Sequence, residues 1–177
     1  MKQGKVFFVR HGESEANTKG MFAGQRENSP LTKKGREQAK QVAFDLLSKE
    51  IKPQRVIVSP LIRSYETAQI IIHHAKLKDA KIMVEKRIAE YDMGSLTGTP
   101  YRKITSKELV AAENAEDPQK FMDRLHSLLE EIINTNEIIL IVSHAGVGRI
   151  IETNKKGLPA STFYDLDPFP NAQVIEL

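Results

Sequence analysis

Cysteine is absent from this chain of 177 residues. Disulfide bonds, thiolate catalysis and cysteine metal sites are therefore excluded. Long apolar runs are absent as well: the stretch from Val6 to Val9 is too short for the core of a signal peptide. No segment approaches the roughly 20 apolar residues of a membrane-spanning helix. We therefore expect a cytoplasmic protein that does not interact with membranes.

The chain also lacks a strong excess of charge of either sign. It has 26 Lys and Arg against 23 Asp and Glu, and these residues are scattered. No basic block or aromatic-rich basic strand suggests binding to nucleic acid, so we expect no such partner. The length is sufficient for one domain with a sizeable core, and we expect a single domain over residues 1–177. The sequence leaves both a monomer and a homodimer open.

Strand-like and helix-like segments alternate along the chain. Short runs of apolar residues predict strands at Lys5–Arg10, 55–59, Lys81–Val84, 137–143 and 172–177. Helices are predicted after the N-cap residue Thr32, at about 64–74, from Pro118 and after Gly146, with a weaker helical pattern at about 101–112.

The predicted helices have apolar faces. The helix after Thr32 carries Ala39, Val42, Ala43, Leu46 and Leu47 on one face, and the helix from Pro118 carries Phe121, Leu125, Leu128, Leu129 and Ile132. The strands are apolar throughout rather than alternating, which is typical of a parallel sheet that is covered on both faces. The fold class is therefore α/β, a three-layer α/β/α sandwich with a mostly parallel central sheet.

Polar residues with useful chemistry follow three of the predicted strands. Arg10 and His11 end the first strand, Arg63 follows the second, and Ser143-His144 follows the fourth. Ligands of parallel sheets bind beyond the carboxyl ends of the strands, so we expect these side chains to lie together. Arginine matches phosphate oxygens, and histidine can act as a nucleophile or carry protons near neutral pH. Taken alone, an Arg-His pair at a strand end has a simpler explanation: strand ends are exposed to solvent and often carry polar residues.

Other residues could complete a phosphate site. Gly12, Ser14 and Asn17 offer backbone and side-chain donors directly after His11. Breaking a phosphoester also requires a proton for the leaving oxygen, which a nearby carboxylic acid supplies. Glu90 lies between a predicted strand and two glycines. Without the other motifs, it could equally be an exposed acid in a loop. A metal site would need a third ligand besides His11 and His144, and no such spacing is present. We therefore expect no metal site.

Five ordered motifs span the chain. They are Arg10 to Ser14 with Asn17; Asn28 to Thr32 with Gly35, Gln38 and Ala39; Ser59-Pro60-Leu61 with Arg63, Thr67 and Ala68; Glu90 with Gly94 and Gly98; and Ser143 to Gly146 with Arg149, followed by Pro170-Asn171. Each motif is weak alone, but the ordered set resembles the histidine phosphatase superfamily, the phosphoglycerate mutase-like enzymes.

The resemblance implies a role for each matching residue. His11 would be the nucleophile that becomes phosphorylated, and Arg10, Arg63 and His144 would form the phosphate pocket around it. Glu90 would be the general acid and later the base that activates water. The resemblance also implies that neither a metal nor an organic cofactor is needed.

The resemblance also marks secondary positions. Asn17 would be an accessory phosphate contact. Arg149 matches the pattern too, but its place on the helix after His144 favours an ion pair on the helix surface. The chain departs from the family pattern at Leu96 and Thr97, where an aromatic residue and an acid are frequent, at Asn28, where aspartate is common, and at Ala145, where glycine is frequent.

The resemblance leaves four functions open. The first is a metal-independent phosphatase for a small phosphorylated metabolite. The second is a cofactor-dependent phosphoglycerate mutase, although mutases of the family resemble longer chains with extra basic and aromatic insertions. Here Tyr101, Arg102 and Lys103 could contact an anionic substrate, or they could simply begin a helix in solvent. The third is a phosphoprotein phosphatase, and the fourth is a non-catalytic phosphate binder, which the presence of His11 and Glu90 disfavours.

Overall fold

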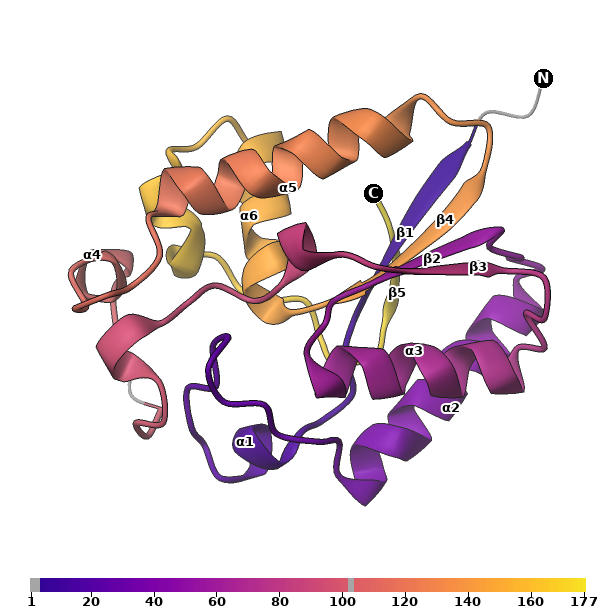
Figure 1. The fold of residues 1–177 in the computed structure, drawn as a ribbon, viewed down its shortest axis with the longest axis horizontal. Coiled ribbons are helices and arrows are strands. Elements are labelled where there is room, and N and C mark those ends of the chain that lie inside the picture. Colours follow the sequence, from indigo (N-terminus) through magenta and orange to yellow (C-terminus); the bar gives the residue numbers. More distant parts are fainter. Residues whose placement is uncertain (1–3, 102–103) are drawn as a thin grey trace.

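The computed structural model describes residues 4–101 and 104–177. Its centre is a five-stranded sheet with the strand order β3-β2-β4-β1-β5 (Figure 1). The strands are β1 (Lys5–Arg10), β2 (Arg55–Val58), β3 (Lys81–Val84), β4 (Ile138–Ser143) and β5 (Val174–Glu176). The first four run parallel to their neighbours, and β5 pairs antiparallel with β1 at one edge. The sheet is therefore mostly parallel.

Helices cover both faces of this sheet. They are α1 (Glu15–Thr18), α2 (Lys33–Ser48), α3 (Ile62–His74), α4 (Ser106–Val110), α5 (Pro118–Ile133) and α6 (Ala145–Lys155), with 3-10 helices at Lys86–Ile88 (η1), Gly94–Leu96 (η2) and Ala160–Asp165 (η3). Figure 1 shows α2 and α3 on one face and α5 and α6 on the other. The prediction of a three-layer α/β/α sandwich is confirmed.

The uninterrupted apolar strands explain this layering. Successive side chains of a strand point to opposite faces, so a strand that is apolar throughout needs cover on both sides. In β1, Phe8 packs into the core under α5 and α6. Its neighbours Phe7 and Val9 pack into the core under α2 and α3. Each face of the sheet is thus covered by a pair of helices.

Most predicted elements are present, with differences at their ends. Helix α3 begins at Ile62 rather than Ser64, and the weak pattern at 101–112 yields only the short α4. The prediction that Leu47 belongs to the buried face of α2 is wrong, because its side chain is 42% exposed. Each helical residue turns by about 100°, so only one of the neighbours Leu46 and Leu47 can face the sheet squarely. Leu46 takes that place.

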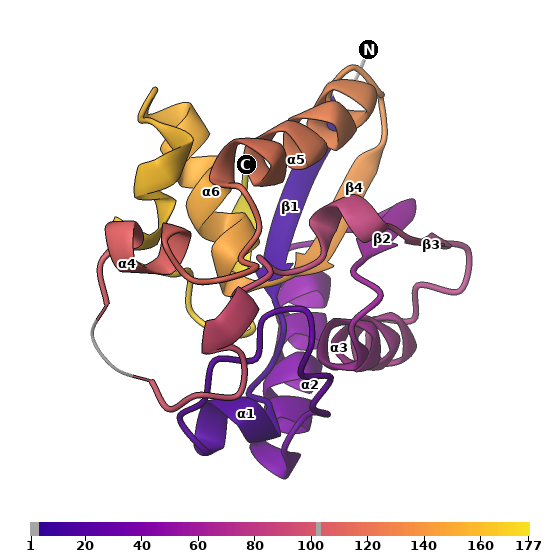
Figure 2. The ribbon, with the colours of Figure 1, turned by 60° about the vertical axis from the view of Figure 1, so that its left-hand side comes forward.

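The carboxyl ends of β1, β2 and β4 lie at one edge of the sheet, where long loops gather. The loop after α1 meets the segment before α4 there (Figure 2). Phe22 N donates to Thr99 O at 2.9 Å, and Met21 forms a bridge with Pro100. Within the described residues, no helix has both the length and the apolarity to cross a bilayer.

Candidate active site

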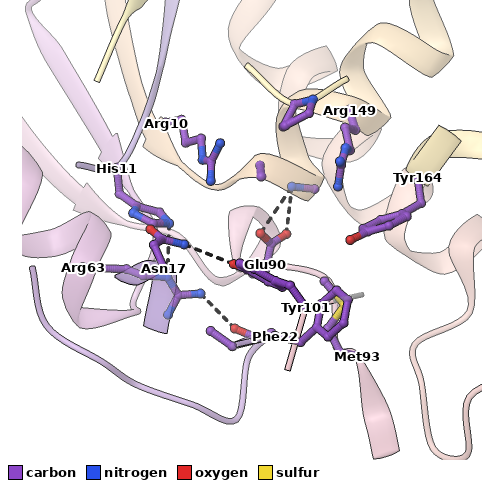
Figure 3. Close-up of a pocket in the computed structure, with 15 residues that line it drawn as sticks. Arg10, His11, Asn17, Phe22, Arg63, Glu90, Met93, Tyr101, Arg149 and Tyr164 are labelled. Carbon is purple, nitrogen blue, oxygen red and sulfur yellow. Dashed lines mark hydrogen bonds between the residues drawn. The ribbon is translucent and has the colours of Figure 1, made fainter. Parts of the chain in front are cut away.

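A cavity of about 260 Å³ lies at this edge of the sheet (Figure 3). One side, which we call the inner wall, consists of Arg10, His11 and Arg63. The opposite side, the outer wall, includes Tyr101, Arg149 and Tyr164. Glu90 lies between the two walls (Figure 3). The cavity is therefore strongly cationic at its inner end and partly aromatic at its mouth.

His11 is fixed by the backbone on both sides. Its amide donates to Ser143 O at 2.9 Å, which extends the pairing of β1 and β4 by one residue. Its ring Nδ1 lies 2.6 Å from Gly12 O, so Nδ1 carries the proton and the lone pair is on Nε2, where it accepts a hydrogen bond from Arg63 Nε. Burial, together with the charges of Arg63 and Arg10, holds the pKa of His11 well below its usual value. A neutral, oriented imidazole is suited to nucleophilic attack.

Gly12 allows the turn after His11 to pack closely on α2. A Cβ at Gly12 would overlap the carbonyl oxygen of Gly35, and a Cβ at Gly35 would overlap that of Glu13. The Gly12 amide donates to Thr67 Oγ1 at 3.1 Å. Two facing glycines and one threonine thus set the position of His11.

Arg63 is a buried cation, only 2% exposed. Its terminal nitrogens donate to Gly24 O and Glu27 O, and its Nε donates to His11 Nε2 at 3.2 Å. These carbonyl partners reduce the cost of burying the charge, and they tie α3 to the loop over the cavity. Burial lowers the pKa of Arg63, and the carboxylate of Glu90 acts in the opposite direction.

Two buried nitrogen atoms of the site have no hydrogen-bond partner among the described residues, Arg10 Nε and His144 Nδ1. Arg10 donates from another nitrogen to Phe169 O at 3.0 Å. The ring of His144 lies behind the inner wall, 5.2 Å between centroids from that of His11. Its Nε2 contacts Ser59 Oγ at 2.6 Å. Buried donors without partners are costly. Arg10 lines the cavity, so its Nε is available to an anion there, whereas His144 is not among the lining residues.

Glu90 is buried, at 7% exposure, and is not the exposed loop acid that its sequence context alone would allow. Its Oε1 accepts from the amides of Tyr91 and Gly146, at 2.9 and 3.1 Å. A Cβ at Gly146 would overlap this same oxygen. From behind, Arg124 donates to the backbone carbonyls of Arg87 and Glu90. The glycine near the start of α6 therefore allows the carboxyl group to face the cavity.

Asn17 lies at the rim of the cavity. Its Oδ1 accepts from Ser14 N at 3.0 Å and its Nδ2 donates to Tyr101 OH at 3.2 Å. Ser14 is used as the N-cap of α1, so its hydroxyl is engaged locally. Of the segment considered for substrate contact, Tyr101 lines the cavity. Arg102 and Lys103 lie outside the described residues.

The prediction that Arg149 forms an ion pair on the helix surface is wrong. Instead, its Nε donates to Leu166 O at 2.8 Å and its guanidinium stacks 4.2 Å from the ring centroid of Tyr164. Both residues line the cavity, and sequence reasoning did not identify Tyr164 as part of it. The family-pattern match of Arg149 was the only available signal.

One departure from the family pattern, Asn28, and one histidine outside the site, His126, have local explanations. Asn28 Oδ1 accepts from Ile62 N at 2.8 Å, a capping contact that aspartate would make equally well. His126 is an exposed residue of α5 that pairs with Glu130 and lies outside the cavity. Among the described residues, no group of three or more His, Cys, Asp and Glu side chains could hold a metal ion.

The fold and the site have the features expected of an enzyme that acts on phosphoryl groups. The profile of the histidine phosphatase superfamily (branch 1) matches residues 6–177. This chain belongs to the histidine phosphatase superfamily, and the resemblance found in the sequence is confirmed.

Individual relatives agree with this assignment. A protein of Escherichia coli (strain K12 / DH10B) described as "Probable phosphoglycerate mutase GpmB" is 33% identical over 171 residues, which is 88% of this chain and 76% of the relative. The protein of the same name from Photorhabdus laumondii is 40% identical over 104 residues, 59% of this chain and 46% of the relative. The solved structure of a mycobacterial glucosyl-3-phosphoglycerate phosphatase with VO3 superposes with a TM-score of 0.79 at 22% identity, and the match covers 97% of this chain and 91% of that one.

Proposed function

We propose that this enzyme is a metal-independent phosphatase that hydrolyses a small phosphomonoester through a phosphohistidine on His11. The observation that carries the proposal is the geometry of His11, a buried neutral imidazole with Nδ1 fixed on Gly12 O and Nε2 beside Arg63. Arginine and histidine donors stabilise the charge of a transferring phosphoryl group without a metal. The cavity of about 260 Å³ is below the roughly 300–1,000 Å³ typical of drug-sized ligands, so it suits a small metabolite.

The first step forms the phosphoenzyme. Nε2 of His11 attacks phosphorus, the P–N bond forms and the bond from phosphorus to the ester oxygen breaks. Glu90 gives its proton to the departing oxygen, and the alcohol leaves. Arg10 Nε, His144 Nδ1 and Arg63 stabilise the negative charge of the phosphoryl oxygens, which supplies the unpaired buried nitrogens with a partner. Asn17 is an accessory contact at the rim.

The second step returns the enzyme to its initial state. Glu90 now accepts a proton from water, the water oxygen attacks phosphorus and the P–N bond breaks. Inorganic phosphate leaves, and the acid is protonated again for the next turn. The same carboxyl group serves both steps because it faces the cavity between the nucleophile and the mouth (Figure 3).

A phosphoglycerate mutase is the second candidate, and the names of the curated relatives favour it. A mutase must exclude water while the phosphoenzyme persists. Here Tyr101 at the mouth is 48% exposed, which favours access of water and therefore hydrolysis. Conversion of 3-phosphoglycerate with and without 2,3-bisphosphoglycerate, alongside release of phosphate, separates the two activities. Phosphopeptides carrying phosphohistidine or phosphotyrosine test the phosphoprotein alternative.

Trapping the phosphoenzyme tests the proposal directly. Enzyme turning over a 32P-labelled phosphomonoester in EDTA is quenched in alkali, where phosphohistidine survives. We expect label on the peptide that contains His11, label on an otherwise identical His126→Ala variant, and none on His11→Ala. An unlabelled polypeptide from enzyme that is turning over would refute the proposal, and loss of turnover in EDTA would refute its metal independence. Phosphate binding without any turnover would indicate a non-catalytic binder.

A further inference from the structure

Arg149 is a cation of the cavity that the proposed chemistry leaves unused. It lies on α6, one turn beyond the helix start, with its side chain directed into the cavity (Figure 3). The contact of Nε with Leu166 O and the stacking on Tyr164 hold the guanidinium in place. No carboxylate of the described residues forms a salt bridge with it. A half-buried arginine that is held rigidly and has no acidic partner is suited to bind an anion.

The charges around the cavity indicate that this anion comes from the substrate. Arg10, Arg63 and Arg149 line the cavity, and among the described residues Glu90 is the one carboxylate that lines it. When Glu90 carries the proton that the first step needs, three positive charges face a phosphomonoester with two negative charges. One positive charge then remains without compensation. Burial lowers the pKa of Arg10, the charges of Glu90 and Tyr101 raise it, and the charge of Arg149 lowers it, as expected for like charges close together.

The position of Arg149 identifies the part of the substrate that it meets. In phosphoryl transfer, the nucleophile and the leaving oxygen lie roughly in line on opposite sides of phosphorus. His11 is on the inner wall, and Figure 3 shows Arg149 and Tyr164 on the opposite side, beyond Glu90. The alcohol part of the substrate therefore extends toward Arg149 and Tyr164.

We propose that Arg149, stacked on Tyr164, is the specificity-determining residue for a second anionic group on the leaving alcohol. This inference rests on the proposed function and adds its substrate class: a phosphomonoester whose alcohol carries a carboxylate or a second phosphate. The guanidinium binds that group through its terminal nitrogens, and the stacking on Tyr164 restricts its movement.

Matched substrates test the assignment. The first pair is phospholactate and its methyl ester, and the second is propane-1,3-diol bisphosphate and 3-hydroxypropyl phosphate. We expect the enzyme to prefer one anionic member over its partner in kcat/KM by about 10-fold to 100-fold, the range of a charge-assisted hydrogen bond. Arg149→Met should remove most of that preference, and Arg149→Lys should retain part of it. Lys155→Met, which removes a positive charge from the far end of α6, should leave the preference intact. The preferred pair identifies the group as carboxylate or phosphate.

Three outcomes would overturn the inference. They are the lack of a preference in either pair, a preference that survives in Arg149→Met, and an equal loss on both members of each pair. The last outcome would mean that Arg149 binds the phosphoryl group or only stabilises the fold. The unfolding midpoints of the variants separate those two explanations.

Binding provides a readout that does not depend on turnover. Calorimetry with a His11→Asn variant measures the affinities for the acid and the ester, with and without Arg149→Met. If the enzyme turns over no ester, the proposed function fails. The subsite is then supported by tighter binding of the anionic member that requires Arg149, and refuted by equal binding.

Discussion

The two walls of the cavity are built differently. The inner wall consists of residues at or just beyond strand ends, and His11 and Arg63 are almost completely buried, at 3% and 2% exposure. The outer wall comes from a loop, the α6 helix and η3, and its Tyr101 is half exposed. Buried charges held by backbone carbonyls cannot move without large cost, whereas side chains at a mouth can vary. In the mechanism proposed above the inner wall carries the chemistry, and we infer that the outer wall selects the substrate.

Arg63→Ala tests this division with the largest expected effect. The substitution removes a buried positive charge beside the proposed nucleophile His11, and we expect kcat/KM for every phosphomonoester to fall by about 100-fold to 1,000-fold. Steady-state kinetics on 4-nitrophenyl phosphate measure it. Arg36→Ala, which removes an exposed arginine of α2, is the matched control. A loss that differed strongly between substrates would contradict the division.

Glu90→Gln should have an effect that depends on the leaving group. General acid catalysis is worth about 100-fold or more when the leaving oxygen is a poor one, and little for nitrophenolate. We therefore expect a loss of about 100-fold on alkyl phosphates and of less than about 10-fold on 4-nitrophenyl phosphate. The control is Asp92→Asn, which alters an acid of the same loop that pairs with Arg26. Equal losses on both esters would remove Glu90 from the acid role.

Sequence reasoning locates the inner wall because its signals are local. A strand that is apolar throughout, followed by Arg-His-Gly or Ser-His, fixes both the element and the place where it ends. In a parallel sheet those ends share an edge, so the sequence alone predicts that Arg10, His11 and His144 lie close together. The layers of the fold follow from the same strands.

The outer wall has no comparable local signal. The buried stripe of α6 leaves Arg149 on a side that the helix pattern alone assigns to solvent. The chain then returns through η3 and covers that side with Tyr164 and the carbonyl of Leu166. Helical periodicity cannot show that a later segment of the chain covers one side of a helix. For this reason the sequence favours a surface ion pair for Arg149. The four-residue α1 and the 3-10 helices are not predicted because such short elements have too few residues to show a period.

The buried histidines behind and within the inner wall should make stability depend on pH. Burial and then the charge of Arg63 lower the pKa of both His11 and His144. The unfolded chain binds protons near pH 6.5, and the folded chain does so only at lower pH, so the free energy of unfolding falls as the pH drops below about 6.5. Each histidine contributes a slope of at most about 1.4 kcal/mol per pH unit.

Urea unfolding between pH 7.5 and 5.5 measures this slope. His144→Gln should show a shallower slope than the natural chain, and His126→Gln, which alters an exposed histidine, should show the same slope. Inorganic phosphate should reduce the slope of the natural chain, because a bound anion favours protonated imidazole. A slope that is unaffected by His144→Gln would show that the ring is not buried in neutral form.

Tyr101→Phe should have the smallest effect. It removes one hydroxyl group, which accepts from Asn17 Nδ2 at 3.2 Å near solvent, and leaves the ring packed edge-on against Phe22. A neutral hydrogen bond at an exposed position contributes about 0.5–1 kcal/mol at most, so kcat/KM should change by less than about fivefold. Kinetics on the substrate pairs of the Arg149 experiment measure it. If Tyr101→Phe were as damaging as Arg63→Ala, the rim would take part in the chemical steps. A small loss of kcat/KM confined to the larger substrates would instead indicate that Tyr101, like Arg149, contacts the alcohol part of the substrate.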